Sequence, residues 1–76
     1  MSEVNIKIPI DEYIGRSIKE WRKAQQISQQ ELAEHLNIST MQISHLERGE
    51  RKWKVVDLSD AADFLNFNLS DLFKNL

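Results

Sequence analysis

The amino-acid sequence predicts an all-α fold of five short helices that follows an extended N-terminal segment. Apolar residues recur at helical spacing from Ile14 onward, and strand-like alternation is confined to the start of the chain. Cap residues separate the helical stretches from one another. The 76 residues suffice for one compact domain, whose core is small enough that dimerisation would be a natural source of further stability.

The N-terminal segment has the alternation of a strand. Pro9 has no N–H to donate to a sheet, so residues 1–10 are expected to form an edge strand or an extended arm. Asp11 is a suitable N-cap for a first helix over residues 12–25, within a helical domain over residues 11–76. The apolar residues of the arm are Val4, Ile6, Ile8 and Ile10.

Two capping boxes predict where the second and third helices begin. Ser28 is followed three residues later by Glu31, and Ser39 is followed at the same spacing by Gln42. Asn37 lies between the two helices and tolerates the left-handed backbone that a tight turn requires. Two capped helices joined by so short a turn must cross steeply, as in a helix-turn-helix motif.

The packing of this helix pair predicts which face of the third helix stays exposed. The small Ala33 allows close approach of the two helices, and apolar residues on both sides of the turn bury the junction. The outer face of the third helix, over about Thr40–Arg48, is then free to enter a major groove that is ~12 Å wide. The apolar anchors are Leu32, Leu36, Ile38, Ile43 and Leu46.

The C-terminal part of the chain predicts two further helices. Gly49 ends the third helix, and an apolar face predicts a fourth helix over residues 55–65 that Asn66 ends. Asn68 caps a short fifth helix, whose apolar stripe is expected to lie mostly in the core and partly at a partner surface. That stripe consists of Leu69, Leu72, Phe73 and Leu76. Trp21 and Trp53 are interpreted as packing residues rather than as platforms for bases.

Charge is distributed unevenly, although the total is only −2. Residues 16–54 carry a net charge of +3, whereas residues 1–15 carry −2 and residues 55–76 carry −3. A basic middle between acidic ends is expected where one face meets phosphate and the others face water. The acidic total, in contrast, favours a protein-interaction module of the same fold that has lost DNA binding.

Several classes of protein are not expected from this sequence. Without cysteine and with two histidines, it has no pattern typical of a disulfide, a metal site or a thiol nucleophile. The serines lack a triad-like setting, and two glycines make no phosphate-binding loop. We therefore expect no enzyme, cofactor, metal or small-molecule ligand. Neither a signal peptide nor a membrane span is predicted, so a cytoplasmic protein is expected.

Five blocks of residues carry a resemblance to a known family. They are Ile18-Lys-Glu-Trp-Arg22, Ile27-Ser-Gln-Gln-Glu-Leu-Ala33, Asn37-Ile-Ser39, Ile43-Ser-His-Leu-Glu-Arg-Gly49 and residues 62–73. Together they resemble the phage repressor and Cro family of helix-turn-helix regulators, also called the xenobiotic-response-element family. The resemblance implies a compact repressor-like DNA-binding domain that reads a palindromic double-stranded operator as a homodimer.

The resemblance also implies roles for individual residues. Gln29, at the start of the second helix, is expected to touch a phosphate. Arg22 and Glu47 match the positions of an ion pair between the first and third helices. The groove-facing positions are Thr40, Met41, Ser44 and His45, with Gln42 as a further candidate whose capping role competes. The phosphate-binding positions that follow are Arg48, Arg51, Lys52 and Lys54.

The sequence departs from the family pattern at two turns and leaves two questions open. Gln26 stands where a glycine usually ends the first helix, and Trp53-Lys54 replaces the usual Pro-Ser/Thr before the fourth. The dimer surface is expected on Leu69, Phe73 and Leu76, with the N-terminal arm as the other option. A restriction-modification controller or an antitoxin that represses its own operon is a related alternative to a stand-alone regulator.

Overall fold

The computed structural model describes residues 9–74, which form five α-helices and no strand. The helices are α1 (Ile10–Ala24), α2 (Gln29–Leu36), α3 (Thr40–Glu47), α4 (Val55–Leu65) and α5 (Leu69–Leu72). The predicted all-α class is confirmed for this part of the chain. Within the same residues, no helix has the length and apolar character needed to cross a membrane.

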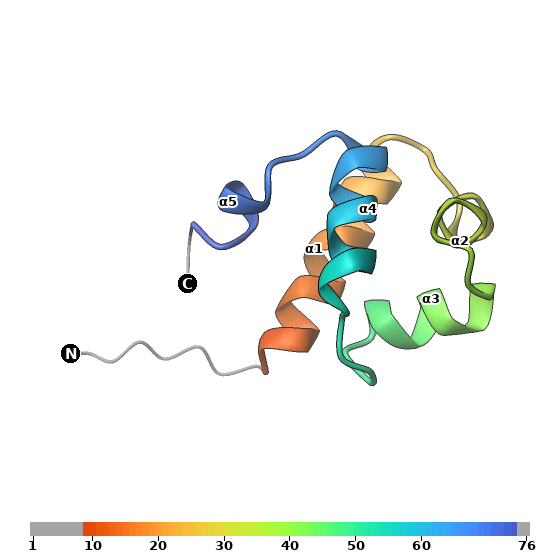
Figure 1. The fold of residues 1–76 in the computed structure, drawn as a ribbon, viewed down its shortest axis with the longest axis horizontal. Coiled ribbons are helices and arrows are strands. Elements are labelled where there is room, and N and C mark those ends of the chain that lie inside the picture. Colours follow the sequence, from red (N-terminus) through yellow and green to blue (C-terminus); the bar gives the residue numbers. More distant parts are fainter. Residues whose placement is uncertain (1–8, 75–76) are drawn as a thin grey trace.

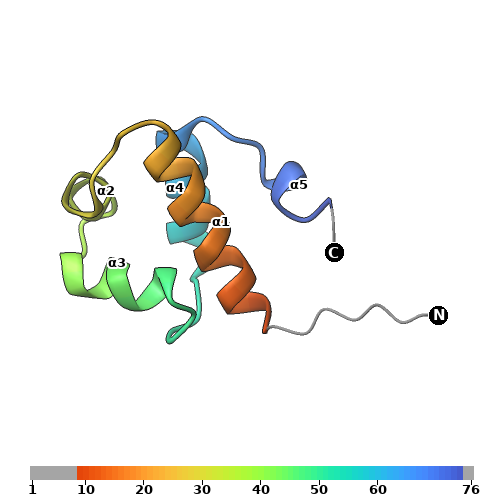
Figure 2. The same ribbon diagram turned by 180° about the vertical axis from the view of Figure 1, so that it is seen from behind.

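The helices are arranged around a central pair (Figure 1). α1 and α4 pack against each other, while α2 and α3 lie on one side of this pair. α5 lies on the other side, as the view from behind also shows (Figure 2). In Figure 1 α2 is seen nearly end-on while α3 runs across the view, so these two helices cross steeply.

The core draws on every helix. Each of the five helices contributes one large side chain that is fully buried, so every helix of the described residues is anchored in the core. Full burial of such an aliphatic side chain stabilises the folded state by about 1.5–3 kcal/mol. These side chains belong to Ile18, Leu32, Ile43, Leu65 and Leu72.

Both predicted capping boxes are confirmed. The Ser28 hydroxyl accepts from the Glu31 N–H, and the Glu31 carboxylate accepts in return from the Ser28 N–H. Ser39 and Gln42 exchange the same two hydrogen bonds at the start of α3. Asn37, in the turn between α2 and α3, has the predicted left-handed backbone with φ of 61°.

The first helix begins earlier than the sequence analysis expected. α1 starts at Ile10, which was assigned to the arm, and Pro9 occupies the N-cap position. Proline suits this position because its φ of −58° is compatible with the approach to a helix and its carbonyl accepts a first-turn N–H. The prediction of Asp11 as the N-cap was wrong. Its carboxylate accepts instead from the backbone N–H of Trp53 at 3.3 Å. The remainder of the predicted arm, residues 1–8, lies outside the described residues.

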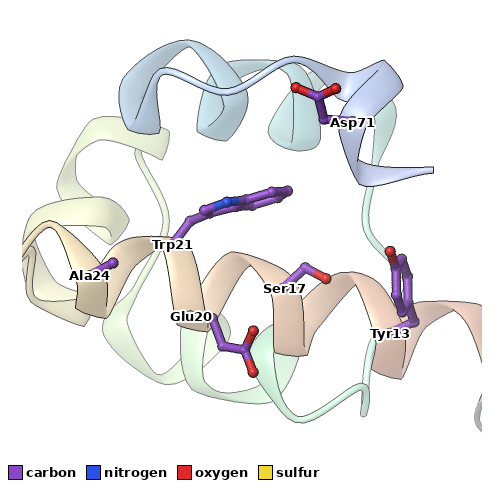
Figure 3. Close-up of a pocket in the computed structure, with 6 residues that line it drawn as sticks. All are labelled: Tyr13, Ser17, Glu20, Trp21, Ala24 and Asp71. Carbon is purple, nitrogen blue, oxygen red and sulfur yellow. The ribbon is translucent and has the colours of Figure 1, made fainter. Parts of the chain in front are cut away.

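Two aromatic residues of α1 hold α5 and the turn before it against that helix. The Tyr13 hydroxyl donates to the Leu72 carbonyl at 2.6 Å, and the Trp21 ring stacks on Phe67 with 4.1 Å between centroids. Trp21 is half-buried and packs against the core, whereas Trp53 is buried. Between α1 and α5 these contacts leave a hollow of about 470 Å³, into which the Trp21 ring projects (Figure 3). Its lining residues are Tyr13, Ser17, Glu20, Trp21, Ala24 and Asp71.

Gly15 allows the backbone of α1 to touch the end of α3. A Cβ atom at this position would lie 2.2 Å from the Leu46 carbonyl oxygen and 2.7 Å from that of Glu47. Both obstacles are backbone atoms of a packed helix, so neither can move aside as a flexible side chain would. Gly15 therefore sets the distance between α1 and α3, a role that the sequence analysis did not assign.

We expect Gly15→Ala to lower the free energy of unfolding by about 1–3 kcal/mol, because the added methyl group forces the two helices apart. Helix propensity alone would make the alanine variant more stable by about 1 kcal/mol, so a loss of stability must come from the clash with α3. Urea denaturation measures it, with the exposed Lys19→Ala on the same helix as a control expected within about 0.5 kcal/mol of the wild type. A Gly15→Ala protein as stable as the wild type would contradict the close approach.

Candidate nucleic-acid interface

α3 buries one face and presents the other to solvent. Ile43, Leu46 and Glu47 are buried against the domain, which turns the residues between them outward. Met41 is the extreme case, an apolar side chain that is 70% exposed near the start of the helix. The outward residues follow helical spacing, so the structure brings them together on one surface: Thr40, Met41, Ser44, His45 and Arg48.

Two glutamines expected to contact DNA have protein partners in the structure. Gln29, the first residue of α2, donates its side-chain amide to the Glu47 carboxylate at 2.9 Å. The side-chain oxygen of Gln42 accepts from the Ser39 N–H at 2.9 Å, as the capping box requires. Gln29 therefore lies against the end of α3, and Gln42 lies at its beginning.

Arg22 and Glu47 form a buried ion pair between α1 and α3. The guanidinium donates from Nε to Glu47 Oε2 at 2.7 Å and from Nη2 to Oε1 at 3.1 Å. Its Nη1 donates to the Ile27 carbonyl at 2.8 Å, ahead of α2. The side chains are 8% and 2% exposed, so the pair lies almost wholly out of water. It fixes the end of α3 to α1 and to the turn that precedes α2.

A basic segment follows α3. Arg51, Lys52 and Lys54 are exposed and, within residues 9–74, none of them forms an ion pair. All three line a depression of about 80 Å³ that Gln42 and Asp57 also border. Lys54 occupies the N-cap position of α4 without a side-chain capping bond, consistent with the departure noted in the sequence. The segment therefore presents free positive charge beside the outer face of α3.

Glu50 binds two of the expected DNA-contacting residues, and the sequence analysis missed it. Its carboxylate lies 2.6 Å from His45 Nδ1 and accepts from Arg48 Nε at 3.0 Å. Arg48 also donates from Nη1 to the Ser44 hydroxyl at 2.8 Å. The hydrogen bonds from Arg48 and His45 lower the pKa of the Glu50 carboxyl to about 2.

The turn at Gly49 explains why Glu50 lies beside His45. Gly49 has φ of 78°, and its N–H donates to the Leu46 carbonyl while the Glu50 N–H donates to the His45 carbonyl. These are the two hydrogen bonds of a Schellman motif, which folds the residue after the glycine back onto the helix. The glycine after α3 was thus the sequence signal for this contact, although the sequence analysis used it only to end the helix.

The steeply crossed α2 and α3, with a capped and outward-facing α3, define a helix-turn-helix domain. Residues 18–72 match the helix-turn-helix family. The chain belongs to this family of DNA-binding transcriptional regulators, in its Cro/C1 type. It is 36% identical over 58 residues to an uncharacterised HTH-type transcriptional regulator, YazB, of Bacillus subtilis (strain 168). That alignment covers 76% of this chain and 84% of the relative.

Solved structures with the same fold include regulators of two kinds. The clp gene regulator ClgR of Corynebacterium glutamicum superposes with a TM-score of 0.85 at 24% identity, over 90% of this chain and 72% of ClgR. The restriction-modification controller protein C.AhdI of Aeromonas hydrophila superposes with a TM-score of 0.74 at 27% identity, over 82% of this chain and 94% of C.AhdI. The ClgR likeness concerns the fold alone.

We expect Glu47→Ala to lower the free energy of unfolding by about 3–5 kcal/mol, because it leaves the Arg22 guanidinium buried without a counter-charge. Arg16→Ala is the matched control, since it breaks an exposed ion pair with Glu12 and should cost less than about 1 kcal/mol. Denaturant midpoints of the two variants give the comparison. Equal midpoints would show that the Arg22–Glu47 pair contributes no more than a surface contact.

Proposed function

We propose that the chain is a homodimeric transcriptional regulator that inserts α3 into the major groove of a palindromic operator. The observation that carries the proposal is the outer face of α3, which residues 9–74 leave uncovered while three cations of the basic segment beside it have no ion-pair partner within those residues. A polar helix face flanked by free cations matches what duplex DNA offers, namely base edges in the groove and phosphates at its rim.

The two kinds of contact fall to different residues in this proposal. Arg51, Lys52 and Lys54 bind phosphates and position the domain without reading sequence. Thr40 and Met41 offer a methyl and a thioether to thymine methyl groups, whereas hydroxyl and imidazole groups hydrogen-bond base edges. Gln29 is the first residue of α2, and its side-chain amide already donates to Glu47. In this proposal it contacts a phosphate at the N-terminus of α2, where the backbone N–H groups favour an anion. The hydrogen-bonding readers are Ser44 and His45.

A second exposed surface supports the homodimer in this proposal. Phe73, after α5, is 40% exposed, and Leu69 beside it is half-buried, so part of the C-terminal apolar stripe faces solvent. α5 and α3 lie on opposite sides of the α1–α4 pair (Figure 1). A two-fold contact through α5 therefore holds two α3 helices apart, as is required to reach successive major grooves ~34 Å apart. Leu76, the third residue proposed for this surface, lies outside the described residues.

A restriction-modification controller is a second candidate for the biological role. C.AhdI supports it because this chain spans 94% of that protein at 27% identity. Selecting the preferred operator from random DNA distinguishes the roles. A controller that acts on its own operon requires that operator upstream of its own gene, whereas a stand-alone regulator of other genes does not.

In the first test, the wild type selects its operator from a random pool, and fluorescence anisotropy measures binding at two salt concentrations. We expect His45→Ala to weaken operator binding by about 1–3 kcal/mol and to relax the preference at one or two base pairs. Lys52→Ala should weaken all sequences about equally and flatten the salt dependence. Lys19→Ala removes the same charge from α1, outside the proposed interface, and should do neither. If no sequence is bound, the chain is instead a protein-interaction module.

The second test concerns the dimer. We expect Phe73→Asp to convert the protein to a monomer in sedimentation, because a carboxylate in an apolar interface is costly to desolvate. A chain that begins at Pro9 keeps α1 intact, removes residues 1–8 and should remain dimeric. Loss of the dimer only in that shortened chain would assign the interface to the N-terminal arm. A chain that is monomeric in every form, even with operator present, would contradict the homodimer.

A further inference from the structure

The contact between Glu50 and His45 replaces one that is usually apolar. In a Schellman motif the residue after the glycine packs on the helix residue five positions before it, frequently through a hydrophobic contact. Here those two positions hold Glu50 and His45, whose carboxylate oxygen and Nδ1 lie 2.6 Å apart. The backbone geometry of the turn thus places the Glu50 carboxylate beside Nδ1 of His45, on the outer face of α3.

The protonation of Glu50 decides what His45 does in this contact. The pKa of the Glu50 carboxyl is lowered to about 2 by hydrogen bonds from Arg48 and His45, so near neutral pH it is ionised and only accepts. Arg48 Nη2, which can only donate, also lies 3.4 Å from His45 Nδ1, but the Glu50 oxygen is much closer at 2.6 Å. Nδ1 therefore carries the proton of the hydrogen bond to Glu50. In a neutral imidazole the other nitrogen then has a free lone pair.

The remaining nitrogen of His45 is available to a ligand. Within the part of the chain that the structure describes, Nε2 forms no hydrogen bond, and the His45 side chain is 33% exposed. Arg48 is held beside it by Glu50 and the Ser44 hydroxyl, so the guanidinium and the imidazole keep fixed places on the helix surface. Glu50 contacts His45 and Arg48 directly, and Arg48 in turn donates to Ser44, so Glu50 holds these three side chains in one hydrogen-bonded group.

We propose that Glu50 locks His45 in the Nδ1–H tautomer, so that Nε2 accepts a hydrogen bond from an exocyclic amino group in the major groove, adenine N6 or cytosine N4. The inference rests on the proposed function and names the base class that one reader selects. In the opposite tautomer Nε2 donates a hydrogen bond and suits an acceptor instead, namely guanine O6 or N7, adenine N7 or thymine O4. Glu50 is then a positioning residue for specificity, although it touches no base itself.

The tautomer is measured first, on the full-length free protein without DNA. Long-range proton–nitrogen correlation spectra at pH 8 and 9 identify which imidazole nitrogen carries the proton, and unchanged spectra between the two pH values identify the neutral form. We expect Nδ1–H in the wild type and a shift of population toward Nε2–H in Glu50→Ala. His35, which stacks on Phe64 and has no carboxylate partner among residues 9–74, serves as the internal reference. A protonated Nε2 in the neutral wild type overturns the inference.

Operator selection then tests the reading itself. Glu50→Ala should change the preferred base at one position from adenine or cytosine, which carry an exocyclic amino group, toward guanine or thymine, which offer only acceptors there, with a change in relative Kd of about tenfold. Glu50→Gln keeps an acceptor for Nδ1–H without the charge and should retain the wild-type base. Glu34→Ala removes an exposed carboxylate of α2 and should leave every base preference unchanged.

A double variant separates His45 from Arg48. Once His45→Ala is present, adding Glu50→Ala should have no further effect at the position concerned. An effect that persists would mean that Glu50 acts through Arg48, and would overturn the inference. Identical base preferences for the wild type and Glu50→Ala would overturn the inference while leaving the proposed function intact. Only a wild type that selects no sequence would overturn both.

Discussion

The orientation of α3 depends on the buried ion pair between Arg22 and Glu47. Removing two charges from water costs several kcal/mol per ion, and only good geometry with further hydrogen bonds offsets that cost. Both conditions hold, because each carboxylate oxygen accepts from the guanidinium and the third guanidinium nitrogen, Nη1, donates to the Ile27 carbonyl. Gln29 adds a third donor to Glu47 from α2. A rotation of α3 would leave a charge buried without a partner, so the pair specifies one arrangement of three helices.

Two glycines complete the attachment of α3 to α1. Gly15 permits contact with the carbonyl groups at the end of α3, and a Cβ at Gly49 would lie 2.6 Å from the Glu12 Cα. The C-terminal end of α3 is therefore held against α1 by close backbone approach at Gly15 and Gly49 as well as by the ion pair. Its N-terminal end is set instead by the turn at Asn37 and by the second capping box. The uncovered face of α3 lies between these two fixed ends.

The parts of the fold that local chemistry determines were predictable from the sequence. Both capping boxes and the turn at Asn37 involve residues within a few positions of each other, so their spacing is sufficient evidence. Gln26 was recognised as standing in a glycine position, and the structure gives it the left-handed backbone that glycine adopts readily, with φ of 60°. The exposure of the outer face of α3 followed from the packing of the helix pair, whereas the individual groove-facing residues were implied by the family resemblance.

The features that sequence reasoning missed depend on which elements meet in space. Asp11 resembles an N-cap, but the chain brings Trp53 to it, and the helix begins after Pro9 instead. Nothing near Gly15 in the sequence reveals that the α3 carbonyl groups lie against it. Glu50 is an intermediate case, since the glycine before it predicts a Schellman motif and hence a contact with His45. Recognising that contact as a hydrogen bond requires placing the two residues in the motif, where the position after the glycine is Glu50 and its partner on the helix is His45.

Two acidic residues near the end of α3 each neutralise an arginine, but only one of these arginines lies at the proposed interface. Glu47 neutralises Arg22 inside the domain, where no phosphate could reach the guanidinium. Glu50 neutralises Arg48 on the surface, next to the proposed groove contacts.

The cations of the basic segment that stay free within the described residues are then Arg51, Lys52 and Lys54. Each phosphate contact releases counterions and contributes to binding regardless of sequence. With these three as the free cations beside α3 among residues 9–74, we expect limited non-specific attraction to DNA, and the acidic total charge limits it further. If α3 reads the operator as proposed, discrimination between sequences must come mainly from how its side chains are oriented, and hence from the proposed positioning by the Glu50 carboxylate.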